Sequence, residues 1–210
     1  TIKVLNDISF KFESGNIYSL VGPSGSGKST LLNILSLIDT PTSGSIEINK
    51  KKIDFDNQIY NDNVRAKKIG VIYQDKNLLS DFSAIENVYL PNLLLSNNKS
   101  TSMYLAKKII KSVGLTSRIN HFPSELSGGE NQRVAIARAI INNPEIILAD
   151  EPTGSLDFEN AKKIFKILFN LKSKNRIIIY ATHNRYFANM ADCKIKMIGG
   201  KMKIVNERID

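Results

Sequence analysis

A run of glycine, serine and lysine follows a short apolar stretch near the start of the chain, and it restricts the fold more than any other feature. The apolar stretch Ile17–Val21 leads into the sequence GPSGSGKST, and the helical pattern Ser29–Ile38 leaves it. The motif G-x-x-x-x-G-K-[ST], placed between a strand and a helix, is typical of a phosphate-binding loop. In such a loop the backbone N–H groups turn inward around phosphate oxygens. The residues of this predicted phosphate loop are Gly22, Pro23, Ser24, Gly25, Ser26, Gly27, Lys28, Ser29 and Thr30. Lys28 is placed to reach β- and γ-phosphates, and the Ser29 hydroxyl to bind Mg²⁺.

Apolar stretches that alternate with helical patterns predict an α/β fold with a parallel sheet. Three stretches rich in β-branched residues are expected to be buried strands: Ile69–Gln74, Glu145–Asp150 and Arg176–Thr182. Helical patterns between them include Asn131–Ile141 and Asn160–Lys172. Looser alternation of apolar and polar residues in Val4–Phe12 and Gly44–Lys51 predicts a small antiparallel sheet.

The middle of the chain has a different pattern. From Asp75 to about Phe122 it is helical, as in Met103–Leu115, and the polar stretch Ser96–Ser102 is expected to be a loop. We therefore expect one domain over residues 1–210, with an α/β core formed by residues 1–74 and about 133–210. An α-helical lobe over residues about 75–132 is inserted into this core.

Composition restricts the compartment and the partners. The formal charge is +9, from 29 Lys+Arg against 20 Asp+Glu, and a basic balance favours polyanions in general. The charges are scattered, and the short run Lys50–Lys52 is expected to be a solvated turn. A single cysteine, Cys193, excludes an intramolecular disulfide and fits a reducing compartment. Apolar stretches are shorter than the roughly 20 residues that span a bilayer, and no signal peptide is recognised, so we expect a soluble intracellular chain.

Polar residues follow the predicted strands at the edge where ligands bind in parallel sheets. Asp150 is placed to bind Mg²⁺ directly or through water, and Glu151 to orient or deprotonate an attacking water. Gln74 can bond the metal shell or that water, and His183 can donate to a γ-phosphate. Each residue alone also fits an ordinary polar strand end or helix cap, but together they favour a phosphate-transfer site.

A second glycine-containing helix start, Ser127–Gly129, also suits an anion. Because a helical insertion separates it from the phosphate loop, one molecule can hardly bring both to the same γ-phosphate. Two copies arranged head to tail would let each Ser-Gly-Gly cap the ATP of its twin. The simpler alternative is an ordinary serine N-cap followed by a flexible glycine pair.

The motifs GPSGSGKST, Gln74, LSGGENQR, ILADEPTGSLD and ATH, in this order, resemble the ATP-binding subunit of ABC transporters over nearly the whole chain. The resemblance implies the P-loop NTPase fold of ABC ATPases, with ATP and Mg²⁺ as cofactors and the head-to-tail dimer as the working form. It also implies nucleotide contacts from the signature segment Leu126–Glu130, through Ser127, Gly128, Gly129 and Glu130. In the same way Gln74 would link the metal to a membrane subunit, Asp157 would meet the partner's phosphate loop, and His183 would be the switch histidine.

Two longer stretches, Ile72–Leu94 and Asn120–Phe165, look like the lipoprotein-releasing (LolD-type) ATPases of Gram-negative bacteria. That group implies a peripheral subunit at the cytoplasmic face of the inner membrane, bound to integral inner-membrane subunits. ATP-driven closure would release lipoproteins toward a periplasmic carrier. Macrolide-exporter and cell-division ABC ATPases are close alternatives. Asp75–Pro91 is the candidate docking surface, with an apolar patch expected at Leu78, Leu79 and Phe82.

A nucleic-acid-dependent ABC ATPase is a third class, and we expect no nucleic-acid partner. The stretch from Ser29 to Ser127 is too short for the long coiled coils of the chromosome class, and the chain has one cassette where the ribosomal class has two. A regulatory cell-division ATPase that transports nothing stays open.

Asn184 stands where the family often has Asp, and Ser155 where the subgroup often has Asn. The family's adenine-stacking aromatic would lie upstream of Val4, so Phe10 and Phe12 are expected to be packing residues.

Overall fold

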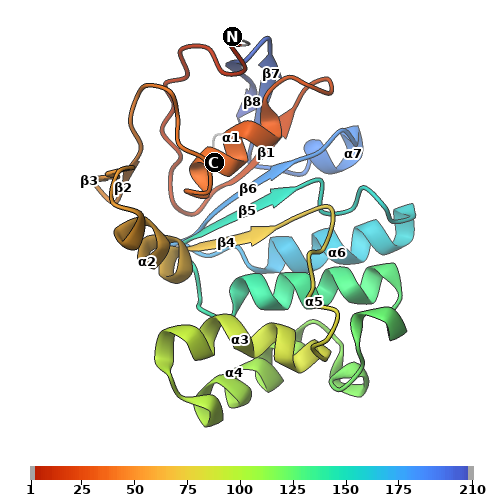
Figure 1. Ribbon diagram of the computed structural model, residues 1–210. Coiled ribbons are helices and arrows are strands. Elements are labelled where there is room, and N and C mark those ends of the chain that lie inside the picture. Colours follow the sequence, from red (N-terminus) through yellow and green to blue (C-terminus); the bar gives the residue numbers. More distant parts are fainter. Residues whose placement is uncertain (1–2, 208–210) are drawn as a thin grey trace.

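A six-stranded sheet in the order β4-β5-β6-β1-β7-β8 forms the centre of the molecule (Figure 1). The computed structural model describes residues 3–207. The strands are β1 (Ile17–Val21), β4 (Ile69–Ile72), β5 (Ile146–Asp150), β6 (Ile177–Ala181), β7 (Cys193–Ile198) and β8 (Lys201–Glu207). All neighbouring pairs are parallel except β7 and β8, which are antiparallel with a register shift between Lys194 and Ile195. The predicted α/β fold with a mostly parallel sheet is therefore confirmed.

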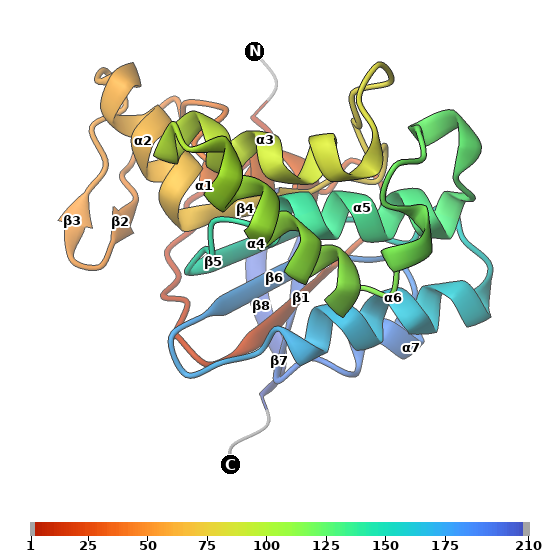
Figure 2. The same cartoon turned by 90° about the horizontal axis from the view of Figure 1, so that it is seen from below.

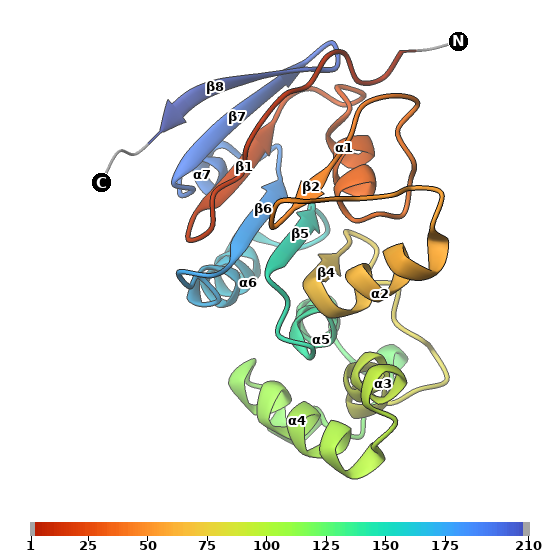
Figure 3. The ribbon, with the colours of Figure 1, turned by 90° about the vertical axis from the view of Figure 1, so that its left-hand side faces the viewer.

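Helices cover both faces of this sheet. They are α1 (Lys28–Leu35), α2 (Gln58–Lys68), α3 (Ala84–Ser96), α4 (Lys99–Ser112), α5 (Gly128–Ile140), α6 (Phe158–Asn170) and α7 (Arg185–Ala188), with 3-10 turns at Thr116–Arg118 and Pro123–Glu125. Figure 3 shows α1 on one side of the sheet and α5 and α6 on the other. The apolar runs of the strands follow from this arrangement, because alternate side chains enter two separate cores. Ile17 and Tyr180 pack toward α5 and α6, whereas Tyr18 and Ala181 pack toward α1.

The section over residues 75–132 is helical, as expected, and α3 and α4 pack side by side with α3 against α5 (Figure 2). Its own apolar core includes Val88, Ile110 and Val134. The loop expected at Ser96–Ser102 is wrong, because α3 ends at Ser96 and α4 begins at Lys99. Asn97 takes a left-handed conformation that ends α3, and the Asn98 side chain accepts the N–H of Thr101 and caps α4.

The strand expected at Val4–Phe12 is also wrong. This segment forms no strand and bends at Asp7, whose φ is 47°, and Asn6 N–H donates to the carbonyl of Gly200 at 2.8 Å. Its alternation reflects packing instead, since Phe10 and Phe12 lie 4.7 Å apart and Phe12 lies 5.0 Å from Tyr18 between ring centroids. Both phenylalanines are therefore packing residues, as expected.

The small antiparallel sheet is formed by β2 (Glu47–Ile48) and β3 (Lys51–Lys52), and not by the two longer segments that the sequence suggested. The turn between these strands contains Asn49 and Lys50, both with positive φ. Lys51 and Lys52 thus belong to a short exposed strand, and only Lys50 lies in the expected turn.

Candidate nucleotide-binding site

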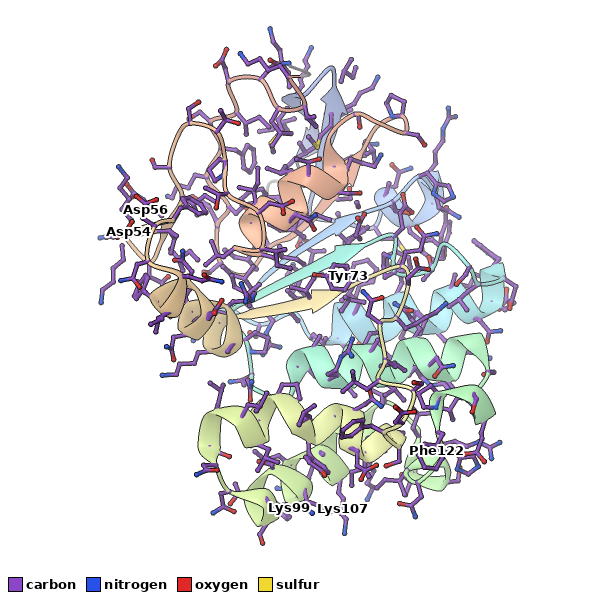
Figure 4. The ribbon with its side chains drawn as sticks, viewed as in Figure 1. Asp54, Asp56, Tyr73, Lys99, Lys107 and Phe122 are labelled. Atoms are coloured by element: carbon purple, nitrogen blue, oxygen red, sulfur yellow. The ribbon has the colours of Figure 1, made fainter. Side chains whose placement is uncertain are left out.

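The predicted site residues follow four neighbouring strands. The phosphate loop follows β1, Gln74 lies two residues beyond β4, Asp150 ends β5, and His183 lies two residues beyond β6. Because β4, β5, β6 and β1 are adjacent and parallel, these segments leave the same edge of the sheet. Figure 1 shows the N-termini of α5 and α6 on this side too, and Figure 4 shows Tyr73 just beyond the end of β4.

The phosphate loop folds tightly between β1 and α1. A Cβ atom on Gly22 would overlap the carbonyl oxygen of Met197 and lie 2.8 Å from the Ser26 hydroxyl. Gly27 caps α1 with φ 96°, where a side chain would also meet Leu5. The Lys28 ammonium donates to the carbonyls of Gly22 and Pro23 at 2.9 and 3.1 Å, and so lies within the loop.

This loop fits a nucleotide phosphate. Ser26 is buried, and its hydroxyl has no hydrogen-bond partner among the residues that the structure describes. A buried hydroxyl without a partner is unfavourable unless a ligand or water satisfies it. The ligand side of the loop also has the Lys28 ammonium and the N-terminus of α1, both of which attract anions. The Ser29 hydroxyl, the Asp150 carboxylate and the Gln74 amide oxygen are the kind of hard oxygen donors that suit Mg²⁺.

Glu151 follows β5 in a strained conformation. Its φ is 44°, a left-handed value that costs a non-glycine residue about 1–2 kcal/mol. Its backbone N–H donates to the carbonyl of Ala181 at 3.1 Å, which ties the end of β5 to the end of β6. The Glu151 carboxylate is mostly buried, and its Oε2 lies 3.0 Å from Nδ1 of His183. Strain of this kind concentrates at functional sites, where the surrounding structure maintains it.

His183 is exposed and is oriented by the segment that follows it. The Oδ1 atom of Asn184 accepts the backbone N–H groups of Tyr186 and Phe187 and caps α7. The departure from Asp at this position therefore leaves the cap in place, because Asn and Asp are equivalent N-caps. Glu151 and His183 line a cavity of about 140 Å³ together with Gly154, Thr182 and other residues.

The loop beyond β4 rests on the segment beyond β5. Gln74 is exposed, and a Cβ atom on Gly154 would lie 3.0 Å from its Nε2. The Lys76 ammonium donates to the Ser155 hydroxyl at 2.8 Å. Arg138 of α5 donates to the carbonyls of Lys76 and Asn77 at 2.8 and 2.6 Å. Burial lowers the pKa of this guanidinium, which still pairs with backbone oxygens. These contacts of Lys76, Ser155 and Arg138 were not predicted from the sequence, since contacts between distant loops leave no periodic signal.

The signature segment caps α5 with a complete capping box. The Ser127 hydroxyl accepts the N–H of Glu130 at 3.3 Å, and a Glu130 carboxylate oxygen accepts the N–H of Ser127 at 2.8 Å. These hydrogen bonds, together with an ion pair to Arg118 at 3.0 Å, lower the pKa of Glu130 to about 2. The simpler interpretation, in which Ser127 is the N-cap of a helix, is therefore confirmed.

Gly128 and Gly129 lie beside the segment that contains Asp157. Added Cβ atoms would meet Leu156 at 3.5 Å and Asn160 at 3.9 Å. Asp157 caps α6 by accepting the N–H of Asn160 at 3.0 Å, and its hydrogen bonds with Asn160 lower the pKa of its carboxyl. Among the described residues, no hydrogen bond joins either helix start to the phosphate loop. The signature segment and Asp157 therefore lie side by side, at the starts of α5 and α6.

A Gly-rich phosphate loop beside an acidic strand end and a histidine, with a separate capped helix start, defines a nucleotide-binding ATPase cassette. Residues 5–154 match the model of the family described as ABC transporter, and the chain belongs to this family. The family resemblance and the ABC ATPase fold expected from the motifs are thereby confirmed.

Several individual proteins are similar to this chain over nearly its whole length. The chain is 42% identical to the lipoprotein-releasing system ATP-binding protein LolD of Cytophaga hutchinsonii, over 95% of this chain and 92% of that protein. It is 43% identical to MJ1508 of Methanocaldococcus jannaschii, an uncharacterised ABC transporter ATP-binding protein, over 97% and 91%. The ATP-binding cassette MJ0796, solved as a dimer in a post-hydrolysis state with ADP and Pi, superposes with a TM-score of 0.90 at 34% identity, over 99% of this chain and 91% of that one. None of the helices described within residues 3–207 is long and apolar enough to cross a membrane.

Proposed function

We propose that the chain is the ATP-hydrolysing subunit of an inner-membrane ABC complex that releases lipoproteins toward a periplasmic carrier. The observation that carries the ATPase part is the contact of Glu151 with His183 at the strand ends beside the phosphate loop. The similarity to LolD supports the lipoprotein part. MJ1508, an uncharacterised ABC transporter ATP-binding protein, matches at a similar identity, so the lipoprotein cargo needs its own test. That test must separate it from the macrolide-exporter and cell-division complexes that the sequence also resembles.

In this proposal the phosphate loop binds the phosphates of ATP. Lys28 leaves its two carbonyl partners to meet the β- and γ-phosphates, and the Ser26 hydroxyl gains a partner. Ser29, Asp150 and Gln74 would hold Mg²⁺, which would supply positive charge to neutralise the transferring phosphoryl group. Glu151 accepts a proton from the attacking water, and His183, beside the Glu151 carboxylate, donates toward the γ-phosphate.

The catalytic centre is shared between two copies. Ser127, Gly128, Gly129 and Glu130 of one chain, with its Asp157, approach the ATP on the phosphate loop of the other. The dimeric state of MJ0796 supports this arrangement. Within the described residues 3–207, no hydrogen bond joins these residues to the phosphate loop of their own chain. The helical section over residues 75–132 is then a lobe that presents the signature segment to the twin.

The membrane subunits dock on Asp75–Pro91. Leu79 and Phe82 are 42% and 36% exposed, whereas Leu78 packs partly against the core of the helical section. The expected patch is therefore reduced to Leu79 and Phe82. Asn87 fixes this loop by hydrogen bonds with Leu79 and Phe82, so the two side chains are presented on an ordered surface. The chain is then peripheral at the cytoplasmic face of the inner membrane.

The test is co-purification of the chain with its membrane subunits, followed by release of a labelled lipoprotein from reconstituted vesicles to a soluble carrier. ATP should drive release, and Glu151→Gln should stop it. A complex that hydrolyses ATP but extrudes a macrolide, or that releases nothing, would contradict lipoprotein release while leaving the ATPase assignment intact.

A further inference from the structure

A carboxylate occupies the helix start that is proposed to receive a phosphate. Glu130 is the third residue of α5, and its side chain is 19% exposed. The N-terminus of a helix attracts anions through its free N–H groups and its dipole. An ionised carboxylate in the first turn uses part of that potential and repels a second anion. With its pKa near 2, Glu130 is ionised at any neutral pH.

Arg118 supplies the opposite charge. Its Nε lies 3.0 Å from Oε1 of Glu130, while the other carboxylate oxygen of Glu130 holds the N–H of Ser127. His121 is a further titratable neighbour, and its Nε2 lies 3.3 Å from Nη1 of Arg118. Arg118, Glu130 and Ser127 thus form one hydrogen-bonded chain that ends at the tip of α5.

The segment that carries Arg118 is anchored independently of Glu130. The carbonyls of Ile119 and His121 accept the N–H groups of Ile85 and Ala84, at 3.0 and 2.8 Å, at the start of α3. Figure 4 labels Phe122, which follows this segment at the tip of the helical section. Arg118 is therefore held in place by backbone contacts that would survive a change of its side chain.

We propose that Arg118 is a positioning residue of the shared nucleotide site. Its guanidinium cancels the charge of Glu130 and fixes the tip of α5, so that Ser127 can approach the γ-phosphate of ATP bound to a second copy. This inference rests on the proposed function, specifically on the approach of the signature segment to the twin's ATP.

A double-mutant cycle tests the inference, using Arg118→Met, Glu130→Gln and both together. Each change is made in the full chain carrying Glu151→Gln, so that ATP is held and not split. ATP-driven association is followed by sedimentation velocity, ATP binding by a fluorescent analogue, and folding by thermal melting. Lys107→Met is the matched control, because Lys107 is exposed on α4, where Figure 4 labels it, and the change removes the same charge.

Arg118→Met should weaken association about tenfold or more, since like charges brought together across an interface are strongly unfavourable. ATP binding to the single chain, and the effect of Lys107→Met, should stay within about twofold of the parent. Once Glu130 is Gln, Arg118→Met should add less than about threefold, because no carboxylate is left to neutralise. Arg118→Lys should associate more tightly than Arg118→Met, and so recover part of the association that the methionine variant loses.

Equal weakening by Arg118→Met in both backgrounds would overturn the inference and make Arg118 a mere structural support. No weakening in either background would overturn it too. Ser127→Arg, which blocks the tip, separates this failure from failure of the shared site. If Ser127→Arg abolishes association while the cycle is additive, only the role of Arg118 is wrong. If Ser127→Arg associates like the parent, or if the parent does not associate on adding ATP, the shared site itself fails.

Discussion

The Nδ1 atom of His183 lies 3.0 Å from Oε2 of Glu151, which joins the residue after β5 to a residue two positions beyond the end of β6. Glu151→Gln removes the charge and the proton acceptor but keeps the shape. We expect ATP binding to persist and steady-state hydrolysis to fall at least about 100-fold, the usual loss for a general base. A phosphate-release assay on the purified chain measures this, and hydrolysis at the parent rate would exclude Glu151 as the base.

Asn184 caps α7 and thereby fixes the turn that carries His183. Asn184→Ala should cost about 1 kcal/mol of stability, as loss of an N-cap does, and should lower the hydrolysis rate. Asn184→Asp should match the parent in both respects. Urea unfolding and hydrolysis rates check the pair, and an alanine variant with full activity would show that His183 needs no cap.

Gly154 leaves room for Gln74, whose Nε2 would lie 3.0 Å from an added Cβ. Gly154→Ala should displace the Gln74 side chain and reduce the hydrolysis rate several-fold, with little change in melting temperature because the crowded atom ends a flexible side chain. In a Gln74→Ala background the same change should have no further effect on the rate. An equal loss in both backgrounds would assign the effect to the backbone of Gly154.

Glu130 makes stability depend on pH. Its folded-state pKa of about 2 is below the ordinary value of 4.5, so its hydrogen bonds and ion pair stabilise the fold above pH 4.5. That contribution is lost as the pH falls from 4.5 toward 2. The gap in unfolding free energy between the parent and Glu130→Gln should therefore shrink over this range, as measured by urea unfolding at a series of pH values. A gap that is constant with pH would contradict the ion pair with Arg118.

Phe82 is 36% exposed on the proposed docking surface. Phe82→Asp should leave hydrolysis by the isolated chain unchanged and abolish its co-purification with the membrane subunits, because a charge in an apolar contact must be desolvated. The control is Leu94→Asp at the end of α3, where the parent side chain is 78% exposed. Assembly of the Phe82→Asp variant at the parent level would move the docking surface elsewhere.

The sequence predicted those parts of the fold that local pattern determines. Runs of β-branched residues located β4, β5 and β6 to within two residues, because strands covered on both faces need apolar residues throughout. Ser96–Ser102 was misjudged because asparagine favours turns and also caps helices, and here Asn97 and Asn98 do the second. Val4–Phe12 was misjudged because alternation reports packing, whereas strand assignment depends on a partner far along the chain.

Part of the candidate site could likewise be predicted from the sequence, and part could not. Motif spacing located the phosphate loop, Asp150, Glu151 and His183 at one edge of the sheet, since each lies at the end of a strand or within two residues beyond it. Contacts between loops, such as Lys76 with Ser155, depend on how the helical section sits on the sheet. Spacing carries no information on that placement, so these contacts needed the structure.

Helix α5 has Ser127 at one end and, near the other, Arg138 holding the loop beyond Gln74. The two residues are separated by about 16 Å along the axis at 1.5 Å per residue. If α5 tilted as a rigid body by about 10° about its Arg138 end, Ser127 would move by about 3 Å. That displacement is on the order of one hydrogen-bond length. In the proposed complex, a displacement of the loop beyond Gln74 would therefore be carried along α5 to the helix start that is proposed to meet the twin's ATP.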